Sequence, residues 1–412
     1  MTAHQAGVEA PKWLSIVGIG EDGWEGLSHE AQEAILSAQI IYGGSRHLAF
    51  VPEVNATRLG WPSPMGPAIR QILTEHRGRR NVAVLASGDP MLFGVGASLT
   101  PHVEPAEFQV YPQVSALSLA CARLGWPVAE VSLISVVNRS IEQIYRHLAP
   151  GQRLIIYSEN GATPEKVARL LDECGYGPST MSVLQNLGGS KEHRWDLRAS
   201  SWESTPCSDL NVIAVLCIPG DGAATLSTVP GLPDDTFETD GQLTKREVRA
   251  VTLARLSPLP RQILWDVGAG SGSISIEWMR SHVSCSAIAF EDEPERAARI
   301  RENAMRLGVP GLQVIEGSAP STFGDLTSPD AIFIGGGLQD KAMFDACWAR
   351  LRSGGRLVVN AVTVASQARL ASLEDAYGGE LVRISIERAA PLGRVLGWRP
   401  LMPVTQWAVV KP

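Results

Sequence analysis

The sequence LWDVGAGSGS at residues 264–273 decides the fold of the C-terminal part of this chain. Its apolar beginning predicts a buried β-strand, its glycines predict a tight turn, and the residues that follow have the periodicity of a helix. Glycine allows a sharp bend and lets a ligand approach the backbone N–H groups at the start of a helix. The stretch therefore predicts a strand–turn–helix unit of an α/β fold in which the turn binds a ligand. A turn without any ligand is the alternative for this stretch taken alone.

The ends of the next two apolar runs indicate which ligand fits. The dinucleotide fingerprint G-x-G-x-x-G would need glycine at position 273, where Ser273 stands. The second run ends in Glu291, an acid placed to accept hydrogen bonds from a ribose diol, as it would in an adenosine cofactor site. The third run is followed by Ser318 and Ala319, which are small enough to flank an adenine. These strand ends together predict an adenosine-containing cofactor at one edge of a parallel sheet.

The pattern of strands and helices around this unit predicts two α/β domains. The chain has 412 residues, and single domains usually have about 100–200. Alternating β-rich and helical segments stop after residue 218 in a stretch rich in Pro, Gly and Asp. We therefore expect a disordered tail over residues 1–12, a first domain over 13–219, a linker over 220–236 and a second domain over 237–412. The first domain should contain a largely parallel sheet, and the second should contain β-α repeats with a two-stranded, antiparallel ending.

Composition favours a cytoplasmic protein that binds small molecules. Apolar residues make up 44% of the chain, and the formal charge of −7 gives a nucleic acid no global attraction. No apolar run approaches the roughly 18 residues of a membrane span, and the first residues lack the pattern of a signal peptide. The cysteines are scattered without a C-x-x-C pair, as is typical of buried thiols in a reducing compartment. The spacing of His and Cys favours no metal site.

A second set of glycine motifs, with a different pattern, lies in the first half of the chain. It comprises VGIGEDG at residues 17–23, ASGDPMLFG at residues 86–94 and PQVSALSLA at residues 112–120. In the middle motif, Gly88 permits an unusual turn, and Pro90 can start a helix without leaving an N–H unpaired. An ordinary turn with a helix cap is the alternative for this motif alone. All of these motifs follow predicted strands, so they should meet at one sheet edge.

The two halves resemble two unrelated families of enzymes that use S-adenosylmethionine (AdoMet). The second half resembles the class I, Rossmann-like methyltransferases with a seven-stranded sheet. The first half resembles the tetrapyrrole methylases, whose fold has two α/β subdomains. The fusion in this order, with GQLTKREVR at residues 241–249, is similar to the bifunctional methyltransferases of cobalamin biosynthesis. The resemblance implies one AdoMet per domain, methylation of a precorrin at carbon 5 by the first domain, and methylation at carbon 15 with decarboxylation of the ring C acetate by the second.

The resemblance also implies a set of binding residues in each domain, and it leaves the catalytic residues unassigned. The expected cofactor-binding residues are Gly18, Gly20, Gly88, Asp89, Pro90, Phe93, Ser115 and Ala116 in the first domain, and Thr244, Gly268, Ala269, Gly270, Ser271, Gly272, Glu291, Ser318 and Ala319 in the second. A carboxylate-rich substrate favours basic rims. The candidates for these rims are Arg46, His47, Arg388, Arg394, Trp398 and Arg399. Methyl transfer from a sulfonium needs mainly in-line placement of the acceptor, so no general base is assigned.

Two departures from the family pattern leave alternatives open. Glu21-Asp22 stands where tetrapyrrole methylases usually carry Pro-Gly, and Val137-Asn138-Arg139 stands where relatives often carry His-Gly-Arg. An AdoMet-binding scaffold with an inactive N-terminal site is therefore one alternative. An RNA or protein methyltransferase is another, although the acidic composition and the second methylase domain disfavour it. In the main interpretation the partner is a carboxylate-rich precorrin, with no nucleic acid or membrane, and the protein is a homo-oligomer.

Overall fold

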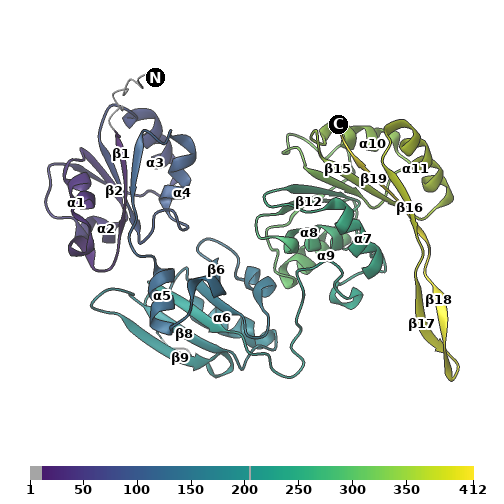
Figure 1. Ribbon diagram of the computed structural model, residues 1–412, viewed down its shortest axis with the longest axis horizontal. Coiled ribbons are helices and arrows are strands. Elements are labelled where there is room, and N and C mark those ends of the chain that lie inside the picture. Colours follow the sequence, from purple (N-terminus) through teal and green to yellow (C-terminus); the bar gives the residue numbers. More distant parts are fainter. Residues whose placement is uncertain (1–11, 204–205) are drawn as a thin grey trace, which may run out of the picture. The chain divides into compact units, whose positions relative to one another are not determined.

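The computed structural model describes residues 12–203 and 206–412, and the chain divides into two compact units (Figure 1). The first unit comprises the described residues up to Arg139 together with Pro150–Ala223, and the second comprises Ser140–Ala149 together with Ala224–Pro412. The tail expected over residues 1–12 lies outside the described residues except for Lys12. No helix within the described ranges is long and apolar enough to cross a membrane.

The first unit begins with a parallel five-stranded sheet in the order β3-β2-β4-β1-β5. Its strands are β1 (Leu14–Ile19), β2 (Ile40–Gly43), β3 (Thr57–Gly60), β4 (Val82–Ser87) and β5 (Phe108–Tyr111). The helices between them are α1 (His29–Leu36), α2 (Ser45–Phe50), α3 (Gly66–Gln71) and α4 (Val95–Leu99). Because the strands are parallel, the motifs that follow β1, β4 and β5 meet at one edge of the sheet.

A second, mixed sheet completes the first unit in the order β6-β7-β10-β8-β9. Its strands are β6 (Val131–Ser135), β7 (Arg153–Tyr157), β8 (Thr180–Gln185), β9 (His193–Arg198) and β10 (Asn211–Leu216), accompanied by α5 (Ala116–Leu124) and α6 (Thr163–Glu173). Only β6 and β7 pair in parallel. The expected parallel arrangement therefore describes the first sheet and not the second, where the short connection between β8 and β9 allows an antiparallel pair.

The second unit contains a seven-stranded sheet in the order β13-β12-β11-β14-β15-β19-β16. Its strands are β11 (Ile263–Val267), β12 (Ser286–Glu291), β13 (Gln313–Glu316), β14 (Ala331–Ile334), β15 (Arg356–Ala361), β16 (Glu380–Ile384) and β19 (Val404–Val410). The helices are α7 (Arg246–Leu256), α8 (Ser273–Ser281), α9 (Pro294–Arg306), α10 (Lys341–Arg350) and α11 (Val364–Tyr377). Strands β11 to β15 are parallel and β19 pairs antiparallel with both β15 and β16, as expected.

Two apolar cores cover the two faces of this sheet. Trp278 of α8 and Leu253 of α7 belong to one core, and Trp407 of β19 belongs to the other. The alternation along β11 explains the division, because Leu264 faces the first core and Trp265 faces the second. Burial of both faces fixes the register of the central strands, and so it fixes where their carboxyl ends lie.

A two-stranded ribbon, β17 (Glu387–Leu392) and β18 (Val395–Pro400), projects from the seven-stranded sheet (Figure 1). The ribbon turns through Gly393 and Arg394, and Gly393 has a φ of +63°, a conformation that two-residue hairpin turns require. Leu396 and Trp398 on the ribbon are each 72% exposed.

The segment expected to be a linker over residues 220–236 is partly built into the second unit. Leu232 is buried in the core of that unit, and the N–H groups of Gly231 and Leu232 donate to the Glu277 carboxylate. The turn-rich composition therefore reflects a chain that wraps onto helix α8, and the division between the units falls earlier, at Ala223.

Candidate functional site

A cavity of about 590 Å³ lies at the carboxyl edge of the parallel strands of the second unit. This volume is in the range of sites for small molecules and cofactors, which lie at this edge in open α/β sheets. One part of its lining is polar and comes from the glycine turn after β11 and from the ends of β12 and β13. The other part, which we call the apolar wall, consists of Val362, Ile384, Ile386, Leu401, Met402 and Val404.

The glycine turn is held against β12 by hydrogen bonds of its own backbone. The N–H groups of Gly268 and Ala269 donate to the carbonyl oxygen of Phe290 at 3.0 and 3.1 Å. The N–H of Gly270 donates to the Glu291 carboxylate at 2.7 Å. Gly270 has a φ of +60°, and a Cβ there would lie 3.2 Å from the carbonyl oxygen of Gln242 across the cavity. The turn is therefore fixed in shape before any ligand binds.

Glu291 lies at the end of β12 and lines the cavity while being only 3% exposed. Burial raises the pKa of Glu291, and the N–H groups of Gly270 and Glu293 that donate to it act in the opposite direction. A buried carboxylate with spare acceptor capacity at this strand end suits the two hydroxyls of a ribose.

Asp266 holds the strand and the helix on either side of the glycine turn together. Its carboxylate accepts hydrogen bonds from the N–H of Ser275 at 3.1 Å and from the hydroxyl of Ser275 at 2.6 Å. The side chain is almost fully buried, and burial raises the pKa of Asp266 to about 6. Asp266 does not line the cavity, so it shapes the site from below.

Most of the residues predicted for the second site do line this cavity. They are Thr244, Gly268, Ala269, Gly270, Glu291, Ser318 and Ala319. Ser271 and Gly272 do not line it. Ser271 is buried, and a Cβ on Gly272 would lie 2.7 Å from the side chain of Ile300, so this glycine allows α8 to pack closely against α9. Contact of any of these residues with a cofactor stays a prediction.

The sequence analysis missed several residues of this cavity. Gln242 and Lys245 belong to the quoted phrase GQLTKREVR, which was a signal that could have identified them. Gly336, Asp340 and Asn360 follow or end strands, as the predicted residues do. The apolar wall had no local signal, because its residues come from β16, β19, the base of the ribbon and the residue after β15, which meet only in the folded sheet.

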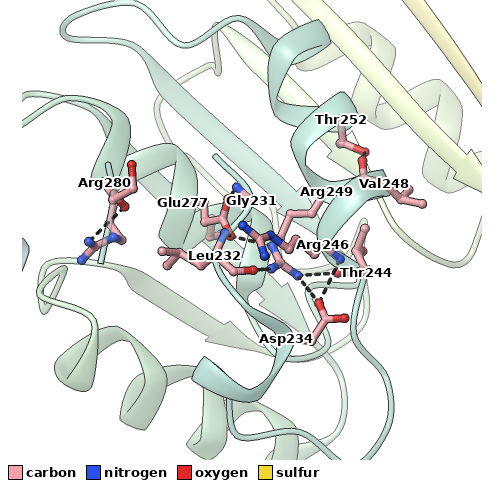
Figure 2. A network of polar contacts seen from close by, with 12 residues as sticks. Gly231, Leu232, Asp234, Thr244, Arg246, Val248, Arg249, Thr252, Glu277 and Arg280 are labelled. Carbon is pink, nitrogen blue, oxygen red and sulfur yellow. Dashed lines mark hydrogen bonds and ion pairs between the residues drawn. The ribbon is translucent and has the colours of Figure 1, made fainter. Parts of the chain in front are cut away.

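A buried polar network supports the cavity from the side of helix α7 (Figure 2). Arg249 is fully buried and donates to the Glu277 carboxylate at 2.6 Å, to Asp234 at 3.3 Å and to the carbonyl oxygens of Thr244 (2.6 Å) and Leu232. Thr244 lines the cavity, whereas the other partners lie beneath it. The network therefore ties the cavity-lining segment before α7 to α8 and to the wrapped chain around Leu232.

The basic residues predicted on the ribbon do not line the cavity. Arg388 at the base of the ribbon donates to Asp234 at 3.1 Å and to Glu247 at 2.6 Å, so its charge is already balanced. Arg399 donates to the carbonyl oxygen of Pro391 at 3.2 Å. Arg394 lies in the ribbon turn and Trp398 is exposed. Their proposed contact with a substrate stays a prediction.

The first unit contains a smaller cavity, of about 70 Å³, between its two sheets. Gly20 and Gly88 line it from the edge of the parallel sheet, and Ala116 lines it from the start of α5. Leu184 and Val212 line it from the mixed sheet. The predicted residues Gly18, Asp89, Pro90, Phe93 and Ser115 do not line the cavity.

Several of these remaining residues shape the loops around the small cavity. A Cβ on Gly18 would overlap the carbonyl oxygen of Gly88, so the two motifs can touch only through glycine. The carboxylate of Asp89 accepts a hydrogen bond from the N–H of Met91 at 2.9 Å. The hydroxyl of Ser115 accepts one from the N–H of Ser118 at 3.1 Å and caps α5.

Glu21, one of the residues that depart from the family pattern, lies at this cavity and has an ion-pair partner there. Glu21 and Arg46 both line the cavity, and they form an ion pair. Arg46 also donates to the hydroxyl of Ser87 at 3.1 Å. Burial, together with the charge of the adjacent Arg46, lowers the pKa of His47 to about 4, so this imidazole is neutral at pH 7. Arg46 and His47, both predicted to bind substrate, therefore stand together beside the small cavity.

Comparison with known proteins identifies a relative for the whole chain and one for each part. Residues 14–201 match the family of tetrapyrrole (corrin/porphyrin) methylases, and residues 235–411 match the precorrin methyltransferase domain. A precorrin-6Y C(5,15)-methyltransferase (decarboxylating) from Sinorhizobium sp. is 45% identical over 400 residues, which is 97% of this chain and 96% of that protein.

Two shorter relatives each match less than half of the chain. A cobalt-precorrin-7 C(5)-methyltransferase from Salmonella typhimurium is 30% identical and covers 43% of this chain and 87% of its own length. A probable cobalt-precorrin-6B C(15)-methyltransferase (decarboxylating) from Saccharolobus solfataricus is 34% identical and covers 32% of this chain and 70% of its own length.

Proposed function

This chain belongs to the family of precorrin-6Y C(5,15)-methyltransferases (decarboxylating), and from that premise we propose the reaction that each of its domains carries out. The protein is an AdoMet-dependent methyltransferase of cobalamin biosynthesis. Its substrate is precorrin-6B, which it methylates at C5 and C15 and decarboxylates at the ring C acetate to give precorrin-8X. Two AdoMet molecules are used for each product.

We assign the C5 methylation to the first domain, and the C15 methylation and the decarboxylation to the second. Relatives named for a C(5)-methyltransferase and for a C(15)-methyltransferase (decarboxylating) exist as separate proteins, and each is similar to less than half of this chain. The tetrapyrrole methylase match ends at residue 201 and the precorrin methyltransferase match begins at residue 235. The division into domains over residues 13–219 and 237–412 is consistent with these matches.

The 590 Å³ cavity of the second unit is the observation that carries this proposal. When AdoMet is bound, its sulfonium supplies an activated methyl group. In our proposal the turn at Gly268 and Gly270 holds the methionine part, Glu291 accepts the ribose hydroxyls, and Ala319 lies beside the adenine. The macrocycle lies along the apolar wall, which excludes water from the reacting carbon.

The first site is proposed on the residues of the small cavity and its loops. Gly20, Gly88 and Ala116 line the cavity. Gly18 lies near the end of β1, and Asp89 and Ser115 lie in the segments after β4 and β5, each next to a lining residue in the chain. In our proposal Pro90 and Phe93 complete the cofactor loop, and His47 and Arg46, the partner of Glu21, meet substrate carboxylates. A cavity of only about 70 Å³ also favours the alternative, an AdoMet-binding scaffold whose N-terminal site is inactive.

The setting of the enzyme is also proposed. We expect a homo-oligomer, because the ribbon exposes Leu396 and Trp398, and exposed apolar patches of this kind mark protein contacts. We expect the protein in the cytoplasm, because its scattered cysteines are typical of a reducing compartment. Nucleic acid has no part in the reaction, since the net charge of −7 disfavours it.

Two measurements test the proposal together. The protein is incubated with precorrin-6B and AdoMet, and the product is analysed by mass spectrometry; equilibrium dialysis gives the number of AdoMet sites. The proposal expects two added methyl groups, the loss of one carbon dioxide, and two AdoMet sites per chain. One methyl group with decarboxylation would establish the scaffold alternative for the first domain. An unchanged substrate would refute the proposed reaction.

A further inference from the structure

One cationic side chain in the cavity of the second unit has no anionic partner. Lys245 and Arg296 are the cationic residues that line the cavity. Arg296 donates to the carboxylate of Asp240 at 2.7 Å and is therefore occupied. Across residues 12–203 and 206–412, the ammonium group of Lys245 takes part in no hydrogen bond or ion pair, although the residue is partly buried. An unpaired cation that lines a partly apolar cavity suits an anionic group on a ligand.

The backbone of Lys245 is fixed, so its side chain reaches the cavity from a defined point. The carbonyl oxygen of Lys245 accepts a hydrogen bond from the N–H of Arg249 at 2.8 Å. The preceding carbonyl, of Thr244, accepts one from the Arg249 guanidinium at 2.6 Å (Figure 2). Lys245 is also the N-cap of α7, a helix of 11 residues. The positive end of the helix therefore adds to the positive potential at this position.

Helix α7 is tied to the sheet by a buried polar residue of its second turn. Thr252 in this helix accepts hydrogen bonds from Asn360 of β15 at 3.1 Å and from Gln406 of β19 at 3.0 Å. Helix α7 therefore lies over the strands that carry the wall, whereas Glu291 and Ala319 follow β12 and β13 on the other side of the glycine turn. Lys245 and Val248, at the start of α7, both line the cavity.

We infer that Lys245 binds the carboxylate of the ring C acetate, which leaves as carbon dioxide. Lys245 then donates a proton to the methylene carbon to which that carboxylate was attached. The inference rests on the proposed function and deepens it, since it names the group that recognises the reacting side chain. A charge-assisted hydrogen bond to a carboxylate is among the stronger polar contacts in proteins. Arg388, Arg394 and Arg399, which the sequence analysis favoured for carboxylates, do not line the cavity.

The chemistry balances with Lys245 as the only added participant. The bond between the exocyclic methylene carbon and the carboxylate carbon breaks, and its electron pair enters the conjugated imine system of the macrocycle. Carbon dioxide departs without charge, which leaves the ammonium unpaired next to the methylene carbon. The electron pair returns to that carbon as it takes a proton from Lys245, forming the methyl group. Lys245 then regains a proton from solvent.

Lys245→Met tests this inference, because it keeps the aliphatic chain and removes both the charge and the proton. The full-length variant is given precorrin-6B and AdoMet, and the products are weighed. We expect the KM for the precorrin to rise about tenfold, which corresponds to the loss of one hydrogen bond to a charged group. We also expect decarboxylation to slow at least tenfold more than C15 methylation, so that a methylated product that retains its acetate accumulates.

Lys245→Arg separates binding from proton transfer. Arginine retains the positive charge but does not give up a proton in proteins. The KM for the precorrin should return close to the wild-type value, while decarboxylation stays slow. Full recovery of decarboxylation in this variant would overturn the proton transfer. Lys166→Met, a change on the exposed side of α6 in the first unit, is the matched control and should behave as the wild type.

The outcomes distinguish this inference from the proposed function. Wild-type protein that leaves precorrin-6B unchanged refutes the proposed function. Wild-type activity combined with normal decarboxylation by Lys245→Met refutes the inference alone. AdoMet binding by Lys245→Met is measured in parallel by equilibrium dialysis and should match the wild type. If it falls tenfold or more, the carboxylate held by Lys245 is that of the cofactor, and the inference is wrong.

Discussion

The two candidate sites of this chain use glycine motifs at the same edge of a parallel sheet, yet their cavities measure about 590 Å³ and about 70 Å³. In the second unit the glycine turn, its anchors on β12 and the loops after β13 and β14 all belong to one sheet. In the first unit the cavity lies between two sheets, and the ion pair of Glu21 and Arg46 stands at its lining. A site on one sheet edge is set by local backbone geometry, whereas a site between two sheets depends on how those sheets pack.

The sharpest way to break this comparison is to fill the turn of the second unit with a side chain. Gly270→Val should abolish AdoMet binding at that site, because the backbone is left-handed and the new side chain would enter the cavity. Equilibrium dialysis on the full chain should fall from two sites to one, and both C15 methylation and carbon dioxide release should stop.

The control for Gly270→Val is Gly354→Val. Gly354 has a φ of +75°, and a Cβ there would meet no atom within 4 Å, so the change brings similar backbone strain without filling a cavity. Two AdoMet sites in Gly270→Val would show that the turn does not hold the cofactor.

The first unit can be tested by the matching change in its own cofactor loop. Asp89→Ala removes the acceptor that fixes the turn after β4, which should stop the C5 methylation. The variant should still release carbon dioxide, and its product should be one methyl group short by mass spectrometry. If full double methylation survives, Asp89 has only a structural role, and its assignment to the site should be dropped.

A third test compares how firmly each cavity is supported. Arg249→Met leaves the buried Glu277 without its cation and should lower the free energy of unfolding of the second unit by about 3 to 5 kcal/mol. The side chain of Arg46, the partner of Glu21, is 37% exposed. Arg46→Met should therefore lower the free energy of unfolding of the first unit by less than about 1 kcal/mol. Denaturant titration of both variants measures the difference. Equal losses would contradict the idea that only the second cavity is built on a buried ionic network.

The last test concerns the acid beneath the glycine turn. The pKa of Asp266 is raised to about 6 in the folded protein, so the folded state binds its proton more tightly than the unfolded state does. This group therefore destabilises the fold increasingly as pH rises from about 4 to 6, and the cost persists above that range. Asp266→Asn removes the titration, so the stability of the variant relative to the wild type should increase by about 2 kcal/mol between pH 4 and pH 7.

Thermal unfolding of the second unit across this pH range measures that effect. Asp375→Asn changes an exposed carboxylate near the end of α11 and is the control. A stability difference between Asp266→Asn and the wild type that does not change with pH would mean that Asp266 titrates normally in the folded state.

How much of each site could be predicted from the sequence follows from the range of the interactions that build it. The turn at Gly270 and the acid at Glu291 were identified because a strand, its turn and the next strand end leave local patterns. The apolar wall was missed because Ile386 and Leu401 become neighbours only through the pairing at the ribbon base. The ion pair between Arg388 and Asp234 joins residues far apart in the chain, and no spacing rule predicts it. Lys245 lies in the sequence GQLTKREVR at residues 241–249, but its lack of an anionic partner is visible only in the fold.

The pairing of β17 with β18 restricts which insertions and deletions the ribbon can accept. Ile386 and Leu401 are joined at its base by a hydrogen bond of 2.8 Å, and both line the cavity, while Gly393 and Arg394 form a two-residue turn at its tip. Side chains alternate between the faces of a strand, so adding one residue to one arm would shift the pairing and turn one of these two residues away from the cavity. Adding one residue to each arm would lengthen the ribbon and leave its base unchanged. Insertions and deletions that preserve this enzyme should therefore occur here in even numbers.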